Sequence, residues 1–182
     1  MNPPLAYFLT WHCYATWLPG SAPGSVDDEN RVFGSPFAPA DAEQVAKNAS
    51  RLVNPPVTLD EHCRHAVQAA VVEVCAYRKW RLLALHVRTT HFHAVVVAPG
   101  QPEKVLNDFK AYATRRLRRE SLAGNVDRLW SIHGSTRYVW NEEKLAEVIA
   151  YVVDRQGAPL LPAPIDGRQN QSPERSLQSP ER

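Results

Sequence analysis

The spacing of hydrophobic and polar residues along the chain predicts four strands and three long helices. Runs rich in aromatic and β-branched residues are typical of strands, and they occur at residues 5–17, 81–88, 91–98 and 135–140. Apolar residues that recur three and four positions apart predict amphipathic helices, at residues 58–80, 101–121 and 141–156. Only Arg88–Thr90 separate the second and third strands, so these two strands should pair as an antiparallel hairpin.

The order strand, helix, strand, strand, helix, strand, helix predicts an α+β fold. It matches the ferredoxin-like split βαβ arrangement, an antiparallel sheet with helices packed on one face, plus an extra C-terminal helix. The Gly-, Pro- and Ser-rich segment after the first strand predicts a long functional or disordered loop, with a short helix within residues 41–52. We expect one domain over residues 1–156, and a disordered Pro-, Ser- and Gln-rich tail over 157–182 in which "SPER" occurs twice.

Composition narrows the class of protein. Hydrophobic residues make up 44% of the chain, enough for a core, and a net charge of +2 does not by itself indicate a nucleic-acid partner. The three cysteines form no CxxC pair; we interpret them as buried reduced thiols, with a zinc site at Cys63, beside His62 and His65, as the alternative. No apolar run is long enough to span a bilayer and the N-terminus lacks a basic signal region. We therefore expect a cytoplasmic protein without a membrane partner.

Two histidines open the apolar run "HFHAVVVA". In a strand, residues two apart point to the same face, so His91 and His93 should project side by side while Phe92 turns to the other face. Two imidazoles at this spacing can share a divalent ion. The alternative is that both are exposed sheet histidines without a function.

The densest basic run of the chain is "FKAYATRRLRR", in the second long helix. Its cations are Lys110, Arg115, Arg116, Arg118 and Arg119. Such a run is either a solvated helix face or a phosphate-binding surface. Tyr112 lies at the rim of the apolar stripe, one turn before Arg115 and Arg116. From there its hydroxyl could reach a phosphate, or merely contact water while the ring is buried.

Together these segments resemble the REP-associated tyrosine transposases, single-tyrosine HUH transposases of the IS200-like type. "HVRTTHFHAVVV" resembles their metal motif and "FKAYATRRLRR" their tyrosine helix. "TWHCYATWLPGSAPGSVDDEN" resembles their first strand and loop, and "WSIHGSTRYVWNEEKLAEVIAYVV" their C-terminal segment. The resemblance covers roughly residues 5–156 and excludes the tail.

The resemblance implies that Tyr112 cleaves single-stranded or hairpin DNA and forms a 5′-phosphotyrosine intermediate for strand transfer. It also implies that His91 and His93 hold Mg²⁺ or Mn²⁺, which polarises the scissile phosphate. In the family a polar residue four positions after the tyrosine completes the metal site. Here that residue is Arg116, which has no lone pair to offer, so we expect Asp108 or water as the third ligand.

The candidate DNA contacts lie in the basic helix and beside strand ends. They are Lys110, Arg115, Arg116, Arg119, Trp17, Trp130, His133 and Arg137. Two other functions remain open: an inactive or domesticated relative that only binds DNA hairpins, and a non-catalytic nucleic-acid-binding module. A small metallohydrolase is a weaker alternative, because the barrel enzymes that begin with such a motif need about 250 residues. The sequence leaves the choice between monomer and dimer open.

Overall fold

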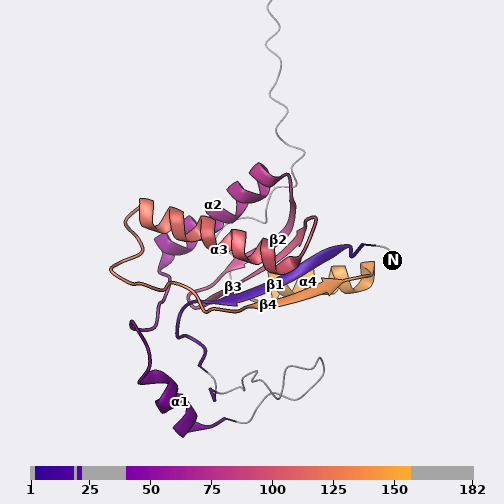
Figure 1. Ribbon diagram of the computed structural model, residues 1–182. Helices are drawn as coiled ribbons and strands as arrows, with labels where there is room; N and C mark the ends of the chain where they lie inside the picture. The colour runs from indigo at the N-terminus through magenta and orange to yellow at the C-terminus, as the bar shows by residue number, and fades with distance from the viewer. Residues whose placement is uncertain (1–2, 19, 22–39, 157–182) are drawn as a thin grey trace, which may run out of the picture.

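The computed structural model describes residues 3–18, 20–21 and 40–156 and gives them four strands and four helices (Figure 1). In chain order the elements are β1 (Ala6–His12), α1 (Ala42–Ala49), α2 (Glu61–Arg78), β2 (Arg81–Val87), β3 (His91–Val97), α3 (Pro102–Arg119), β4 (Ser135–Val139) and α4 (Glu142–Asp154). The predicted order of strands and helices is therefore confirmed. The tail predicted over 157–182 lies outside the described residues.

The four strands form one antiparallel sheet in the order β2-β3-β1-β4. This is the ferredoxin-like order, in which the first and third strands occupy the centre. β2 and β3 pair as the predicted hairpin. β1 runs beside β3 with His12 opposite His91 and Thr10 opposite His93, so the start of β3 and the end of β1 meet at one end of the sheet.

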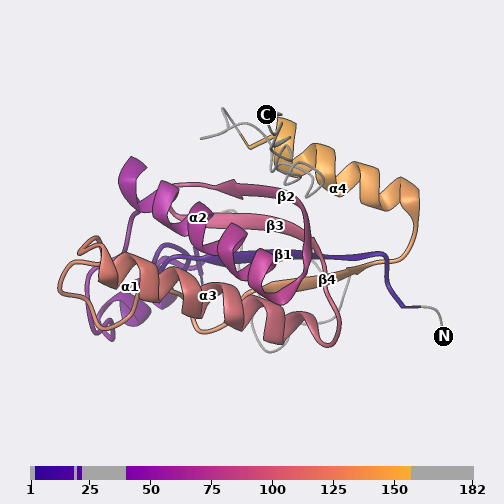
Figure 2. The same ribbon diagram turned by 90° about the horizontal axis from the view of Figure 1, so that it is seen from above.

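Helices cover both faces of the sheet (Figure 2). α2 and α3 lie side by side on one face. The largest fully buried side chains of the core on this face are Trp11, Phe92 and Phe109. α4 lies on the other face, over Ala84, Val95 and Val139. The prediction of helices packed on one face is thus correct for α2 and α3. The extra C-terminal helix, α4, covers the other face, and the order of strands and helices did not predict this position.

The ends of α2 follow from local chemistry. The helix predicted over residues 58–80 has Asp60 as its N-cap, and the Asp60 carboxylate accepts a hydrogen bond from the Cys63 amide at 2.8 Å. At the other end Lys79 takes a left-handed conformation with φ 58° and closes the helix. The strand predicted over residues 5–17 also stops early, at His12, because the chain turns immediately afterwards.

The cysteines behave as the sequence predicts. Cys13, Cys63 and Cys75 are free and buried, and within the described residues no three His, Cys, Asp or Glu side chains are grouped so that they could hold a metal ion. The zinc alternative at Cys63 therefore has no support. None of the described helices combines the length and apolar character needed to cross a membrane.

Candidate active site

His91 and His93 project from β3 toward the α4 side of the sheet. Their ring centroids are 4.9 Å apart, while Phe92 between them is fully buried on the α2–α3 side. Strand alternation produces this arrangement, as expected from the sequence. His91 is half-buried and His93 is 6% exposed, so both rings are largely enclosed by the protein at this sheet end.

A threonine hydroxyl lies within hydrogen-bond distance of Nδ1 in each of the two imidazole rings. The Thr10 hydroxyl lies 2.7 Å from Nδ1 of His93, and the Thr90 hydroxyl lies 3.0 Å from Nδ1 of His91. When Nδ1 carries the proton and donates to the hydroxyl, Nε2 keeps its lone pair free. A partner on the second ring nitrogen is the usual way that a metal-binding histidine is oriented.

Two further histidines, which the sequence analysis did not assign to the site, share this face. His12 lies opposite His91 in the sheet with ring centroids 5.1 Å apart, and His86 lies opposite His93. Burial, followed by the effect of His12, lowers the pKa of His91 to about 4; burial and then His91 lower the pKa of His93 to about 3. Both rings are thus neutral at physiological pH and can act as ligands.

The donor set fits a divalent ion held by two protein ligands. His91 and His93 supply neutral imidazoles with oriented Nδ1 atoms. Mn²⁺ and Mg²⁺ prefer oxygen ligands, but both ions can also bind imidazole nitrogen. Because no group of three His, Cys, Asp or Glu ligands exists among the described residues, phosphate oxygens and water would have to supply the remaining positions.

Tyr151 on α4 packs directly against His93. Its ring meets His93 edge to face, with centroids 5.6 Å apart and planes at 74°. It also meets Phe8 at 6.0 Å, and the residue is 37% exposed. The sequence did not point to Tyr151, because the apolar stripe of α4 was its clearest pattern. The available signal was that Tyr151 lies at the rim of this stripe, next to Val152, just as Tyr112 does on α3.

The expected placement of Tyr112 is wrong. α3 packs on the opposite side of the sheet from the imidazoles, with Phe109 and Ala113 in the core shared with Phe92. Tyr112 lines a cavity of about 240 Å³ between α2 and α3 together with Glu73, Arg115, Arg116 and Arg119. The Arg115 guanidinium lies over the Tyr112 ring, 4.3 Å from its centroid. The sheet therefore separates Tyr112 from the histidines.

Asp108 is also in the wrong layer to serve as a metal ligand. It lies on α3, one turn before Tyr112, and its carboxylate is 3.1 Å from the Arg78 guanidinium at the end of α2. This ion pair joins α2 to α3. The prediction of Asp108 as a third ligand is therefore corrected: its partner is an arginine on the far side of the sheet from His91 and His93.

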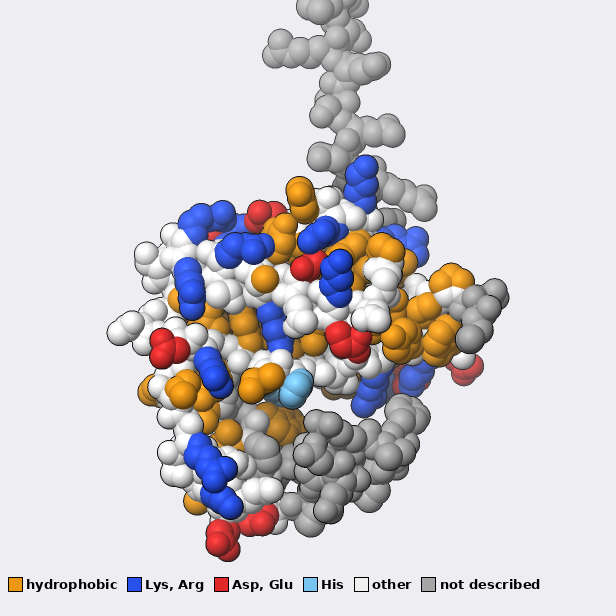
Figure 3. All heavy atoms as spheres, in the orientation of Figure 1, with side chains coloured by type: hydrophobic (Ala, Val, Ile, Leu, Met, Phe, Trp, Pro, Cys, Tyr) orange, Lys and Arg blue, Asp and Glu red, His pale blue; other side chains and the backbone are white. Residues whose placement is uncertain are grey.

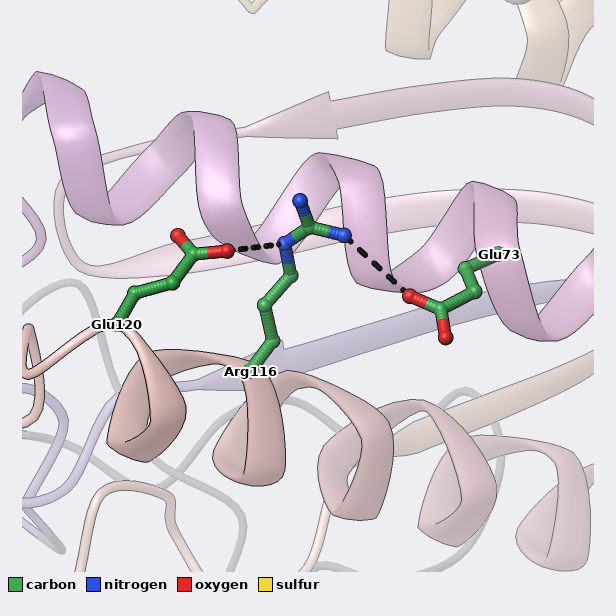
Figure 4. A network of polar contacts seen from close by, with 3 residues as sticks. All are labelled: Glu73, Arg116 and Glu120. Atoms are coloured by element: carbon green, nitrogen blue, oxygen red, sulfur yellow. Dashed lines mark hydrogen bonds and ion pairs between the residues drawn. The ribbon is translucent and has the colours of Figure 1, made fainter.

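The basic residues of α3 fall into two groups. Lys110 is 8% exposed, and its ammonium group donates to the backbone carbonyls of Ser131, Ile132 and His133 at 2.8–3.3 Å. It is a structural residue rather than the expected DNA contact. Arg116 is likewise engaged, by Glu73 at 3.3 Å and Glu120 at 2.9 Å (Figure 4).

The exposed cations of α3 are Lys104, Arg115, Arg118 and Arg119. None of them forms an ion pair with a described residue. Lys and Arg side chains gather over the surface formed by α2 and α3 (Figure 3). This surface can attract phosphate, but it lies on the other side of the sheet from the histidines.

The remaining predicted contacts divide between the site and the core. Trp130 is structural: its indole N–H donates to the Thr114 hydroxyl at 2.8 Å, and its ring packs edge to face against Trp11 at 6.2 Å. Arg137 is exposed and lies opposite Phe8 in the sheet register, so it shares the histidine face. His133 is exposed, and its carbonyl is one of the acceptors for Lys110.

Trp17 is exposed beside the histidine cluster. Its ring centroid is 4.8 Å from that of His12, so it continues the row of rings that begins at His93 and His91. Of the four residues predicted to contact DNA outside α3, Trp17 and Arg137 are thus positioned on or beside the histidine face.

Comparison with known proteins finds similarity to transposases at the level of three-dimensional structure. No protein-family model matches the chain, and no curated protein matches it. A REP-associated tyrosine transposase bound to a REP hairpin is similar at 10% sequence identity with a TM-score of 0.45, over 84% of this chain and 66% of that one. A candidate transposase of Deinococcus radiodurans is similar at 15% identity with a TM-score of 0.44, over 87% of this chain and 95% of that one. The chain thus spans less than two thirds of the hairpin-bound transposase.

Proposed function

We propose that this protein is a metal-assisted transposase that nicks single-stranded or hairpin DNA, with Tyr151 as the nucleophile in place of Tyr112. The observation that carries the proposal is the packing of the Tyr151 ring against His93, 5.6 Å between centroids. A phenol beside two neutral imidazoles, at the open end of a sheet, combines a nucleophile with a phosphate-activating site. We assign this activity to residues 1–156.

The proposed reaction is a transesterification at the scissile phosphate. The Tyr151 phenolic oxygen attacks the phosphorus of the scissile phosphodiester and its proton passes to water. The bond from phosphorus to the 3′ oxygen of the preceding nucleotide breaks, and this oxygen takes a proton from water and leaves as a hydroxyl. The products are a 5′-phosphotyrosine and a free 3′ hydroxyl, and attack by a 3′ hydroxyl on the phosphotyrosine rejoins DNA. The covalent intermediate conserves the bond energy, which suits strand transfer.

The protein's own groups have separate roles in this scheme. His91 and His93 would hold Mg²⁺ or Mn²⁺, which when bound polarises the phosphate. Thr10 and Thr90 orient the two rings. Phe8 stacks on His93 at 5.8 Å and supports the Tyr151 ring from the side. Arg137, opposite Phe8 on the same face, would attract the DNA backbone.

The direct test is a covalent protein–DNA adduct. We expect the purified protein, incubated with labelled single-stranded DNA from the flanks of its own gene and Mn²⁺, to give a band that survives denaturing electrophoresis. Chelation of the metal should remove it. Absence of an adduct with any divalent ion, despite binding of the DNA, would favour the second candidate.

That second candidate is a relative that binds DNA hairpins without cutting them. The observation that favours it is the metal site, to which the described residues contribute only two imidazoles and no third His, Cys, Asp or Glu ligand. The basic surface of α2 and α3 would still bind DNA in this case.

A further inference from the structure

Trp17 is held in place by a turn that is tied to the histidine hairpin. Directly after β1 the Cys13 amide donates to the Thr90 carbonyl at 2.7 Å. The Thr16 hydroxyl donates to the carbonyls of Cys13 and Thr90 at 2.9 and 3.0 Å. Thr90 immediately precedes His91, so the backbone of the Trp17 turn and the start of β3 form one hydrogen-bonded unit.

The same turn contains a strained residue. Ala15 has φ 59°, in the left-handed region that is strained for a residue with a Cβ. The Tyr14 amide, which donates to the Leu129 carbonyl at 2.9 Å, fixes the turn from the other side. The fold thus accepts a strained backbone where it positions Trp17, a pattern that is common at functional sites.

The indole of Trp17 is exposed although its position is fixed. One side meets His12 at 4.8 Å between centroids, and 39% of the residue is open to solvent. By contrast Trp11, six residues earlier and on β1, is fully buried. A flat apolar ring that is held in place and left open can accept a second flat ring.

The row of rings connects this indole to the histidine pair. Centroids are 4.8 Å apart from Trp17 to His12, 5.1 Å from His12 to His91, and 4.9 Å from His91 to His93. Two ring contacts therefore separate Trp17 from His91. A nucleotide whose phosphate lies at His91 and His93 would have a neighbouring base within reach of the indole.

We propose that Trp17 is the stacking platform for an unpaired nucleobase next to the phosphate at His91 and His93. The inference rests on the proposed function, because it takes the histidine pair as the phosphate site. Every base has a π face, so stacking here is tolerant of sequence but requires an unpaired base. Trp17 would thus make the site selective for single strands over duplex DNA.

Trp140 provides a matched control. It is 59% exposed and stacks on Tyr138 with centroids 5.7 Å apart and planes at 14°. It follows β4 at the sheet end where Val139 pairs with Ala6, the opposite end from His12. Trp140→Leu removes a comparable exposed indole at a distance from the histidines.

The test is a double-mutant cycle that combines substitution of Trp17 with removal of single bases from the strand. Affinity for a fluorescent single strand from the gene's flanks is measured for wild type, Trp17→Leu, Trp17→Phe and Trp140→Leu, with a set of strands in which each base in turn is abasic. We expect Trp17→Leu to weaken binding by about 5- to 150-fold, the equivalent of 1–3 kcal/mol for one stacked base. Trp17→Phe and Trp140→Leu should stay close to wild type.

The cycle also predicts one position where base and indole are coupled. An abasic site there should weaken binding to wild type as much as Trp17→Leu does, and should cause no further loss in Trp17→Leu. Equal affinities of Trp17→Leu and wild type, additive losses at every position, or no binding of the strand by wild type would each overturn the inference. Because the readout is binding, coupling without a covalent adduct would retain the stacking platform and reject the nuclease, and an adduct without coupling would do the reverse.

Discussion

The Tyr151 ring stands edge-on to the His93 ring, 5.6 Å between centroids and 74° between planes, where α4 crosses β3. His93 alternates with Phe92, so it faces the α4 side, and Tyr151 lies just before Val152, which anchors α4 in the core on that side. This relationship determines which tyrosine can act with the imidazoles. It also separates the proposed chemistry from the basic surface of α2 and α3.

Substitution of His91, or of the threonine that orients His93, should weaken metal binding. We expect His91→Ala to weaken Mn²⁺ binding at least tenfold, because one of two protein ligands is lost. Thr10→Val should weaken it about tenfold, because Nδ1 of His93 loses its partner. Titration calorimetry measures both, with His62→Ala, an exposed residue at the start of α2, as control. Unchanged affinity in His91→Ala would place the ion elsewhere.

The exposed arginines of α3 should determine part of the salt dependence of DNA binding. We expect Arg115→Ala with Arg119→Ala to flatten the slope of log K against log salt by about 0.7 for each lost phosphate contact with a single strand. Arg116→Ala should leave the slope unchanged, because Glu73 and Glu120 already pair with it. Equal slopes for the double variant and wild type would show that α3 presents only a solvated face.

Lys110 should matter for stability and not for DNA. Lys110→Met leaves three backbone carbonyls without their donor, and we expect the free energy of unfolding to fall by about 3 kcal/mol. Lys104→Met, at an exposed position on the same helix, should cost little. Urea denaturation compares the two, and salt titrations of the folded Lys110→Met protein should match those of wild type. A stable Lys110→Met protein with weakened DNA binding would contradict this assignment.

The buried thiols should make the fold sensitive to alkali. Burial raises the pKa of Cys75 to about 12, whereas an unfolded cysteine titrates near 8.5. Above that value the unfolded chain releases this proton and the folded one keeps it, so the contribution to stability is present below pH 8.5 and is lost as pH rises toward 12. Between pH 8 and 10 wild type should lose about 2 kcal/mol more stability than Cys75→Ala. Parallel pH profiles in denaturant unfolding would refute this.

The sequence predicted the frame of the molecule because its elements have clear periodicities. The hairpin of β2 and β3, the core stripes of α2 and α3, and the shared face of His91 and His93 all follow from local spacing. Each of these features depends on residues that lie close together in the sequence, so the spacing of apolar and polar residues is enough to predict it.

What the sequence could not supply was the layer in which each helix lies. Tyr112 and Tyr151 both stand at the rim of an apolar stripe, and only the packing of α3 and α4 on opposite faces distinguishes them. The basic run drew the assignment to Tyr112, although Arg116 and Lys110 there are used for internal contacts. His12 was missed because its contact with His91 depends on strand pairing between residues 79 positions apart in the chain.

The identity of the nucleophile is tested most directly by two single-atom changes. Tyr151→Phe and Tyr112→Phe each remove one oxygen and little volume, so fold and DNA affinity should change little in both. Labelled single-stranded DNA with Mn²⁺ is resolved on a denaturing gel for wild type and the two variants. We expect the covalent adduct to disappear in Tyr151→Phe and to persist in Tyr112→Phe. An adduct that persists in Tyr151→Phe and disappears in Tyr112→Phe would contradict the account.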